Sequence, residues 1–246
     1  DRRRFRRQVQ AVFQDPFESF NSLYKVDHVL EVPLQKFRLA TGRADMQRRM
    51  EAALRAVGLR PEETLGRYPH QLSGGQRQRI MVARALMLDP KLIIADEPVS
   101  MIDASLRAGV LASLRKLRDE FGISLVYITH DLTTAYQVCD NILVLYRGAV
   151  VEAGSAALVV REPQHPYTRL LVNSIPWPDP DRLWADEGEP SPLAAQAQEE
   201  RGCLFARRCP HTFDRCLQEP PPFYQMRAQQ AATCFLYQDA PELPFD

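Results

Sequence analysis

The pattern of apolar and polar positions divides the first part of the chain into helical segments and short strands. Apolar residues return every three or four positions in some stretches, which is the spacing of one helix face. Other stretches are short apolar runs, and the later ones have the unbroken character of strands buried on both faces of a parallel sheet. The pattern predicts helices over about 46–57, 76–88 and 104–121, and strands over 9–13, 92–95 and 123–129.

Local signals support these boundaries. Gly58 is placed to end the first helix with a left-handed residue, and Pro61 opens a short helix with two glutamates in its first turn. Asp89 precedes a proline and is therefore pushed away from helix, which ends the segment 76–88. Arg147-Gly148 predicts a turn between two short strands within 141–151. Residues 17–70 thus form a helical insertion between strands.

Composition narrows the class of protein. The chain has 246 residues, 45% of them hydrophobic and 25% charged, as in soluble globular proteins. Lys+Arg 31 against Asp+Glu 31 leaves no net charge, so no overall field favours nucleic acid or a membrane. The arginine-rich residues 2–7 predict a solvated basic edge before a strand, because no apolar segment follows to make a signal peptide. Five cysteines are few for a disulfide framework and indicate a reducing compartment.

A possible anion site opens the helix 76–88. Ser73 followed by Gln76 is a capping-box pattern. Gly74 and Gly75 each cost about 1 kcal/mol of helix propensity relative to alanine. They leave the first turn without side chains, where backbone N–H groups are free to bind an anion. An ordinary N-cap with a flexible lead-in explains the same residues, and this stretch alone does not decide between the two.

Polar residues follow three of the predicted strands. Gln14 follows the first strand, Asp96 and Glu97 the second, and His130 the third. Carboxyl ends of parallel strands meet at one edge of a sheet, where ligands bind. Two adjacent carboxylates there could hold a hydrated Mg²⁺ and polarise a water, which phosphoryl transfer to water requires. The alternatives are a plain turn at Gln14, an acidic surface turn at 96–97 and a structural histidine.

With these parts in order over residues 5–160, the chain resembles an ABC transporter ATPase. The resemblance implies an α/β fold: a partial RecA-like P-loop NTPase core with a helical ABC signature subdomain at about 17–88. It also implies binding of ATP and Mg²⁺. The matching motifs are the Q-loop glutamine Gln14, the signature Leu72–Gln76, the Walker B segment Leu92–Pro98, the D-loop Ser100–Asp103 and the H-loop histidine His130.

The resemblance assigns a role to each of these residues. Glu97 is the general base, and His130 contacts the γ-phosphate. Asp96 supports Mg²⁺, while Gln14 senses Mg²⁺ and water. Contacts with ATP held by the opposite subunit, or with that subunit itself, are implied for Ser73, Gly74, Gly75, Gln76 and Asp103.

One motif of this family is absent from the 246 residues. No G-x-x-x-x-G-K-[ST] occurs, although in the family this Walker A loop lies upstream of the Q-loop. The aromatic loop that stacks on adenine is missing as well. The simplest account is a chain truncated at its N-terminus. Without the lysine and its phosphate cradle, we expect this segment not to hold ATP in its own cis site, and to keep the half that acts in trans.

The C-terminal part narrows the resemblance to a subfamily. His165–Leu171 followed by Ser174–Pro176 resembles the C-terminal extension of oligopeptide/dipeptide-type importer ATPases. We expect an ABC ATPase domain over 1–160 and this extension over 161–246, with an acidic linker at 179–201. Thirteen of the nineteen prolines lie at or beyond Pro163, which predicts an irregular appendage rather than a second sheet domain.

Four cysteines in the extension form a candidate metal centre. Cys203, Cys209, Cys216 and Cys234 have the spacing C-x5-C-x6-C-x17-C. A loop-rich segment buries little core and needs a stabilising cross-link, which in a reducing compartment is not expected to be a disulfide. Four thiolates suit a 4Fe–4S cluster or zinc. We favour the cluster, because paired C-x2-C knuckles are missing and some ATPases of this subfamily carry a cluster at a similar place. The alternatives are zinc, with His211 replacing one thiol, and four unligated cysteines.

The resemblance implies the ATP-binding subunit of a peptide-class ABC importer. It would work as a homodimer or beside a related ATPase, at the cytoplasmic face of the membrane. Two permease subunits and an extracytoplasmic binding protein are the implied partners, with no nucleic acid. The family also imports nickel and oligosaccharides, and nothing here chooses among these solutes. The alternatives are a soluble ABC ATPase of DNA repair or translation, and a non-catalytic remnant that binds partners.

Overall fold

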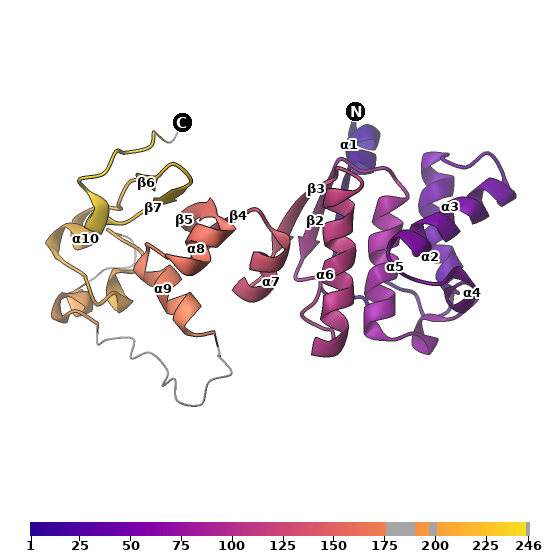
Figure 1. Cartoon of the computed structure of the whole chain (residues 1–246), viewed down its shortest axis with the longest axis horizontal. Helices are drawn as coiled ribbons and strands as arrows, with labels where there is room; N and C mark the ends of the chain where they lie inside the picture. Colours follow the sequence, from indigo (N-terminus) through magenta and orange to yellow (C-terminus); the bar gives the residue numbers. More distant parts are fainter. Residues whose placement is uncertain (176–189, 197–200, 245–246) are drawn as a thin grey trace. The chain divides into compact units, whose positions relative to one another are not determined.

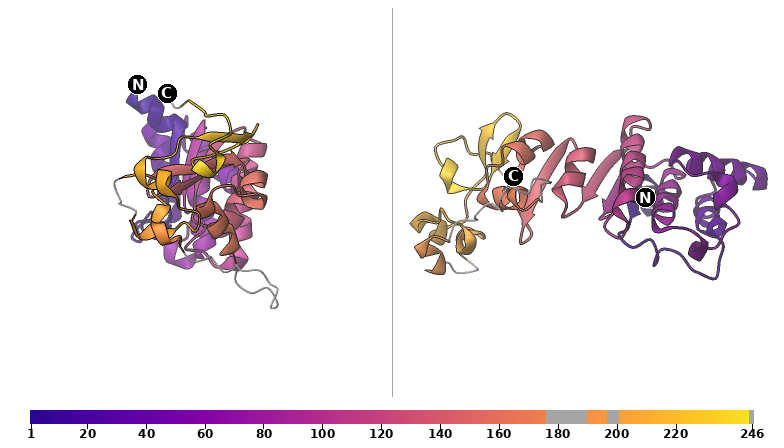
Figure 2. Two further views of the ribbon diagram at one scale, coloured as in Figure 1. Left: turned by 90° about the vertical axis from the view of Figure 1, so that its left-hand side faces the viewer. Right: turned by 60° about the horizontal axis from the view of Figure 1, so that its bottom comes forward.

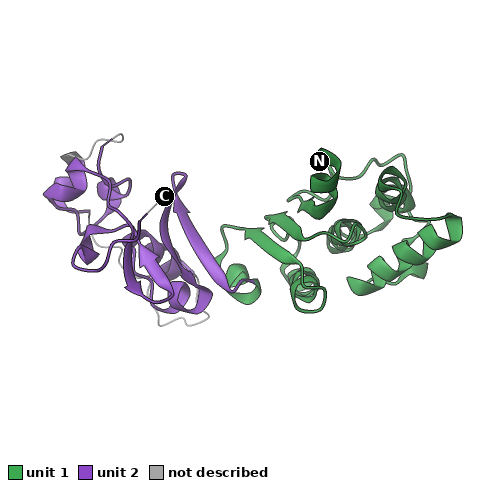
Figure 3. Ribbon diagram, turned by 90° about the horizontal axis from the view of Figure 1, so that it is seen from above, with its two compact units in different colours: residues 1–138 green, residues 139–246 purple. Residues whose placement is uncertain are grey.

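A computed structural model describes residues 1–175, 190–196 and 201–244, which belong to two compact units (Figure 3). Unit 1 comprises residues 1–138 and unit 2 residues 139–246. Each unit has its own sheet and its own buried apolar residues. The linker expected at 179–201 lies outside the described residues except at 190–196 and Arg201. No helix in the described ranges has the length and apolar character that crossing a bilayer requires.

A three-stranded parallel sheet forms the centre of unit 1, in the order β1-β2-β3. Its strands are β1 (Val9–Val12), β2 (Leu92–Asp96) and β3 (Ser124–Ile128). All three predicted strands are therefore confirmed to within one residue at each end. The register pairs Val12 with Ala95 and Asp96 with Ile128, so the three carboxyl ends lie at one edge.

The prediction that these strands are buried on both faces is wrong for one face. On β2, Ile93 and Ala95 are fully buried, whereas the alternate residues are half-buried. On β3, Val126 and Ile128 are each 47% exposed. Successive side chains of a strand point to opposite faces, so the residues of unit 1 cover one face of this sheet more completely than the other.

The segment between β1 and β2 is helical, and the views in Figures 1 and 2 show α5 lying between α6 and the group α2–α4. The helix predicted at 76–88 begins two residues earlier, at Gly74. The helices of unit 1 are α1 (Arg2–Gln8), α2 (Val26–Phe37), α3 (Arg43–Ala56), α4 (Pro61–Thr64), α5 (Gly74–Leu86), α6 (Ala104–Asp119) and α7 (Leu132–Val138), with a 3-10 turn at Pro69–Gln71.

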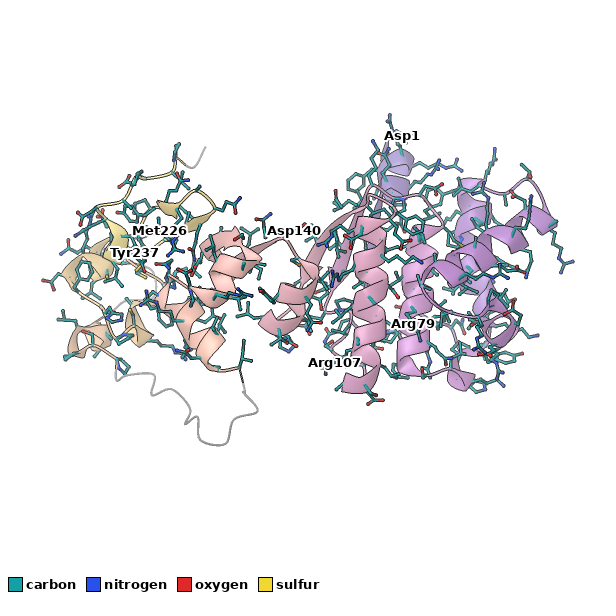
Figure 4. The ribbon with its side chains drawn as sticks, viewed as in Figure 1. Asp1, Arg79, Arg107, Asp140, Met226 and Tyr237 are labelled. Carbon is teal, nitrogen blue, oxygen red and sulfur yellow. The ribbon has the colours of Figure 1, made fainter. Side chains whose placement is uncertain are left out.

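The end of α3 is anchored from two other helices. Gly58 follows it with φ +73°, the left-handed conformation predicted there. Its carbonyl accepts a hydrogen bond from Arg79 Nη1 of α5 at 3.1 Å (Figure 4). Ser113 Oγ of α6 donates to the carbonyl of Val57 at 3.2 Å. These bonds fix the helical segment against α5 and α6.

The basic start of the chain is solvated, as predicted, but it is helical. Asp1 caps α1 by accepting a hydrogen bond from Arg3 N at 2.9 Å. None of the residues of α1 is buried. The apolar pattern could not predict this helix, because Phe5 is its one apolar residue and remains exposed.

Unit 2 contains a four-stranded antiparallel sheet in the order β4-β5-β7-β6. The prediction that the tail is an irregular appendage is wrong here: β6 and β7 come from the tail, and β7 pairs with β5. Such short strands leave little periodic pattern in a proline-rich sequence. The elements are β4 (Asn141–Tyr146), β5 (Ala149–Ser155), α8 (Ala156–Arg161), α9 (Pro166–Asn173), α10 (Asp214–Gln218), β6 (Tyr224–Arg227) and β7 (Gln230–Ala232), with 3-10 turns at Pro192–Gln196, Ala206–Arg208 and Phe235–Tyr237.

The two compact units divide between Val138 and Cys139, whereas the family resemblance placed a domain boundary at residue 160. The difference arises because β4 and β5 share one sheet with strands of the tail. The boundary at 160 stays a prediction about family organisation.

A buried carboxylate ties the sheet of unit 2 to the turn before α9. Glu152 on β5 is fully buried, and its side chain accepts hydrogen bonds from Gln164 N at 3.0 Å and His165 N at 2.8 Å. Gln230 Nε2 of β7 donates to the same carboxylate at 2.8 Å. Tyr237 (Figure 4) donates from its hydroxyl to the Gln164 carbonyl at 3.0 Å. This network joins the tail to β5, alongside the buried side chains of Phe223, Tyr224 and Phe235.

His165 is part of the same arrangement and is neutral. Burial, with a smaller contribution from Arg169, lowers the pKa of His165 to about 4. The neutral ring can therefore accept, and its Nδ1 takes a hydrogen bond from Tyr167 N at 3.1 Å, capping α9.

Glu152→Ala tests this network. The substitution removes the acceptor of the buried His165 N–H, of the half-buried Gln164 N–H and of one of the two hydrogen bonds of Gln230 Nε2. A buried donor left unpaired costs about 1–3 kcal/mol, so we expect the free energy of unfolding to fall by about 2 kcal/mol or more. Guanidinium unfolding followed by circular dichroism measures it. Glu162→Ala is the control, since Glu162 pairs with Arg227 at the surface of the same unit. Equal stability of the two variants would show that Glu152 does not hold the unit together.

Candidate functional site

Three polar side chains meet at the carboxyl edge of the parallel sheet. Gln14 follows β1, Glu97 follows β2 and His130 follows β3. Gln14 Nε2 donates to Glu97 Oε2 at 3.2 Å, and His130 Nδ1 lies 2.8 Å from Glu97 Oε1. The predicted convergence at one edge is confirmed, and Glu97 lies at its centre.

The backbone of Glu97 is held in an unfavourable conformation. Its φ is +42°, in the left-handed region that a glutamate rarely adopts. Its N–H donates to the Ile128 carbonyl of β3 at 2.8 Å, and its carbonyl accepts from Ser100 Oγ at 2.9 Å. Strained residues that the surrounding structure enforces cluster at functional sites. The strain therefore supports a functional reading of Glu97 over an acidic surface turn.

The side chains of this cluster differ in exposure. The Glu97 side chain is 24% exposed and that of His130 is 75% exposed. A carboxylate can only accept, so the proton of a neutral His130 lies on Nδ1 and Nε2 is left to face solvent. This arrangement offers a solvent-reachable carboxylate oriented by an amide and an imidazole. It can take a proton from a water molecule.

Asp96, at the end of β2, is exposed, and its carboxylate makes no hydrogen bond or ion pair with another described residue. Within those residues, no three His, Cys, Asp or Glu side chains are arranged as a metal site. Mg²⁺ keeps several waters and takes one or two protein carboxylates together with phosphate oxygens. Asp96 fits that requirement, and its role in binding Mg²⁺, like that of Gln14, stays a prediction.

The capping box at the start of α5 is present. Ser73 Oγ accepts from Gln76 N at 3.2 Å, and Gln76 Oε1 accepts from Ser73 N at 2.9 Å. Ser73 is exposed, and its hydroxyl hydrogen remains available to a ligand. The amides of Gly74 and Gly75 belong to the first turn and have no partner within the helix. An ordinary N-cap has the same geometry, so the anion site at Ser73–Gln76 stays a prediction.

Packing gives Gly75 a second reason to lack a side chain. A Cβ at Gly75 would lie 3.3 Å from Leu106 Cβ of α6, which is tighter than most real contacts. At Gly74 the nearest such neighbour is the Met101 carbonyl oxygen at 3.9 Å, an ordinary contact. Gly75 thus serves the close approach of α5 and α6, whereas Gly74 has no such steric requirement.

Asp103 lies at the start of α6 and is exposed. Its side chain makes no capping hydrogen bond. The turn before the helix is held by Arg107 (Figure 4), whose Nε donates to the Ile102 carbonyl at 3.0 Å. The Asp103 carboxylate therefore projects from a defined turn and is available for another contact.

The structure brings together the residues at the sheet edge but not the signature residues. Among the interactions of the described residues, no hydrogen bond or ion pair joins Ser73–Gln76 to Glu97 or His130. The two groups are therefore described as separate parts of unit 1.

The sequence did not predict that Gln78 holds the loop of Gln14. Gln78 of α5 is fully buried and donates from Nε2 to the Phe13 carbonyl at 3.0 Å. The available signal was a glutamine on the buried stripe that continues with Val82 and Ala85. A polar residue on such a stripe indicates a specific hydrogen bond.

The four C-terminal cysteines line one cavity of unit 2, of about 20 Å³. All four are free thiols. Burial raises the pKa of Cys203 to about 11 and that of Cys234 to about 12. His165, His211 and Phe205 line the same cavity.

The donor set fits a metal, but its arrangement does not yet form a site. Four thiols facing one cavity are the ligands that zinc and iron–sulfur clusters use. However, the described residues contain no ready set of three or more ligands, and the cavity has room for about one atom or water. The metal centre therefore remains a prediction.

Family comparisons agree with the geometry in both parts of the chain. The family "ABC transporter" matches residues 1–100. The family "Oligopeptide/dipeptide transporter, C-terminal region" matches residues 151–216, which include most of β5 and the turn that Glu152 holds.

Similar proteins cover most of the chain. The oligopeptide transport ATP-binding protein OppF of Salmonella typhimurium is 42% identical over 225 residues, which are 89% of this chain and 66% of that protein. A putative peptide import ATP-binding protein of Brucella ovis is 40% identical over 232 residues, covering 94% of this chain and 73% of that protein. The chain thus spans about two thirds of the length of the Salmonella relative.

Solved structures of ATP-binding cassettes share the fold. A dimeric, post-hydrolysis cassette MJ0796 bound to ADP and Pi matches with a TM-score of 0.54 and 31% identity, over 61% of this chain and 64% of that one. The cassette cbiO1 of Clostridium perfringens, part of the transporter complex cbiONQ, matches with a TM-score of 0.56 and 29% identity, over 64% of this chain and 61% of that one. The predicted α/β ABC ATPase fold is confirmed. The sheet-edge cluster and the signature helix agree with these relatives. The chain therefore belongs to the ABC transporter ATP-binding proteins of the oligopeptide/dipeptide type.

Proposed function

We propose that this chain forms the hydrolytic and signature part of an ATPase subunit that drives import of peptides or a related small solute. The observation that carries the proposal is Glu97, held between Gln14 and His130 at the sheet edge. The similarity to peptide import ATP-binding proteins supports the solute class.

In the proposed reaction, Glu97 accepts the proton of the water that attacks the γ-phosphate. Gln14 and His130 hold its carboxylate in place through the two bonds described above, so little reorganisation is needed when the proton arrives. For His130 to contact the γ-phosphate, as proposed, Nε2 must carry a proton as well as Nδ1, because the phosphate oxygens accept. Asp96 would hold Mg²⁺, which offsets the charge that develops on the phosphate oxygens.

The signature residues are proposed to act on ATP bound to a second subunit. Ser73 Oγ and the amides of Gly74 and Gly75 would donate to the γ-phosphate, with Gln76 keeping the cap in place. Asp103, without a partner for capping, would contact the second subunit. The related cassette MJ0796 is dimeric in its post-hydrolysis state, which supports this arrangement.

The proposed partners follow from the subfamily. They are a second ATPase subunit, two permease subunits and an extracytoplasmic binding protein, at the cytoplasmic face of the membrane. A soluble ABC ATPase of DNA repair or translation is the competing function. Affinity purification separates the two: recovery of permease subunits supports import, and recovery of ribosomes or DNA overturns it.

A metal centre in unit 2 is a further part of the proposal. Cys203, Cys209, Cys216 and Cys234 would ligate a 4Fe–4S cluster, with zinc as the alternative. The shared cavity of the four thiols supports a common ligand. A bound metal would favour the thiolate form and so reverse the rise in pKa that burial produces.

The first prediction concerns the 246-residue chain by itself. We expect no appreciable ATPase activity, because no Walker A loop is present to cradle the phosphates and no other stretch replaces its charge. A phosphate-release assay measures this. Robust turnover that Glu97→Gln abolishes would contradict the prediction.

The second prediction concerns a version of the chain extended upstream by a Walker A loop. Glu97→Gln keeps the shape of the side chain and removes the base, so kcat should fall by at least about a hundredfold. ATP binding should persist and trap a closed dimer, which size-exclusion chromatography with ATP detects. Glu120→Gln, at an exposed site on the same unit, is the control. Unchanged turnover in Glu97→Gln would refute the role of this residue.

The third prediction concerns the cysteines. Anaerobic purification followed by iron, sulfide and zinc analysis should find about four irons per chain. Cys209→Ser should lose them and lower the melting temperature, whereas Cys139→Ser, outside the cavity lining, should keep them. Zinc in place of iron would favour the alternative ligand. A colourless, metal-free protein whose stability is unchanged by Cys209→Ser would end the metal proposal.

A further inference from the structure

We infer that Gln78 is a positioning residue for hydrolysis, which fixes the loop of Gln14 to the helix that carries the signature residues. Its catalytic consequence rests on the function proposed above. Its structural part, that Gln78 holds this loop, stands on the contacts of unit 1 alone.

The bond between Gln78 and the loop is direct. Gln78 Nε2 donates to the Phe13 carbonyl at 3.0 Å, and Phe13 immediately precedes Gln14. The Phe13 side chain is itself exposed, so its burial cannot hold the loop. The loop is therefore fixed at this point through its backbone carbonyl.

Packing alone does not explain a glutamine at position 78. The side chain is fully buried, and its Oε1 has no hydrogen-bond partner. A buried acceptor without a partner lowers stability. A methionine of similar volume would fill the same space without that cost. The benefit that offsets the cost is the bond from Nε2 to the loop.

The neighbouring residue of α5 holds the other end of the same loop. The Arg77 guanidinium lies over the Phe17 ring, 4.0 Å from its centroid. Arg77 also donates from Nε and Nη2 to the Leu72 carbonyl, at 3.1 and 3.0 Å, which anchors it to the signature. Gln78 thus holds the chain before Gln14, and Arg77 holds it after Gln14.

This double attachment sets the distance on which the cluster depends. The Gln14 amide reaches Glu97 Oε2 at 3.2 Å, close to the limit of a hydrogen bond. A small shift of the loop would break that contact and release one side of the carboxylate. Ser73 caps the same helix, α5. An anion bound at the start of α5 and the loop of Gln14 would therefore both be attached to one helix.

Hydrogen–deuterium exchange of the 246-residue chain tests the structural part. Gln78→Met removes the donor and also the unpaired acceptor. We expect the peptide covering residues 13–20 to exchange about two- to tenfold faster, the effect of losing one net hydrogen bond. The melting temperature should stay the same or rise. Gln47→Met, which removes a surface amide bond to Glu51, is the matched control and should leave that peptide unchanged.

A second variant protects the test against misfolding. Phe17 is 52% exposed, so Phe17→Leu should fold normally and remove the ring beneath Arg77. It should speed exchange of the same peptide through the other attachment. Exchange identical to wild type in both Gln78→Met and Phe17→Leu would overturn the inference.

Turnover of the version extended by a Walker A loop tests the catalytic part. In Gln78→Met we expect kcat to fall about ten- to hundredfold, with the KM for ATP nearly unchanged, because ATP contacts are kept and orientation is lost. Faster exchange with unchanged kcat would overturn the positioning role. Absence of turnover in the wild-type extended chain would count against the proposed function, while the exchange experiment still decides whether Gln78 holds the loop.

Discussion

The parallel pairing of β1, β2 and β3 is the constraint on which the site depends. Gln14 and Glu97 lie 83 positions apart along the chain, and Glu97 and His130 lie 33 apart. They meet because their strands end together at one edge, with Val12 opposite Ala95 and Asp96 opposite Ile128. Glu97 is then forced into a left-handed conformation, and its N–H bonds back to β3. A shift of one residue in either pairing would turn the polar side chains toward the opposite face.

Helix α5 links this edge to the rest of unit 1. Its start carries an exposed serine and bare amides, its middle holds the loop of Gln14, and its side packs closely on α6 at Gly75. These requirements explain a glycine in the first turn, which helix propensity disfavours, and a buried glutamine, which packing alone would not favour. The helix tolerates both because each one is matched to a neighbour.

Unit 2 is stabilised differently. Its sheet is completed by short strands from a proline-rich tail, and its buried carboxylate, Glu152, accepts hydrogen bonds from the adjacent residues Gln164 and His165 and from Gln230. Hydrogen bonds to a charged acceptor are stronger than bonds between neutral groups, so these bonds add to the apolar burial of the tail. The thiol-lined cavity lies in the same part of the chain, and Phe205, which lines it, also packs against Tyr146 and Tyr167.

The sequence by itself determined the local structure and the order of the polar motifs along the chain. The helix spacing before Gly58, the capping box at Ser73, the unbroken run before Asp96 and the convergence of Gln14, Glu97 and His130 could all be read from residue types and distances along the chain. Tertiary structure decided the rest, because it depends on pairing between distant segments. The exposed face of β3, the strands β6 and β7, and the buried Glu152 follow from which segments meet, and no periodic pattern encodes that. The bond from Gln78 to Phe13 spans 65 positions, so its meaning appears only when α5 lies beside the loop it holds.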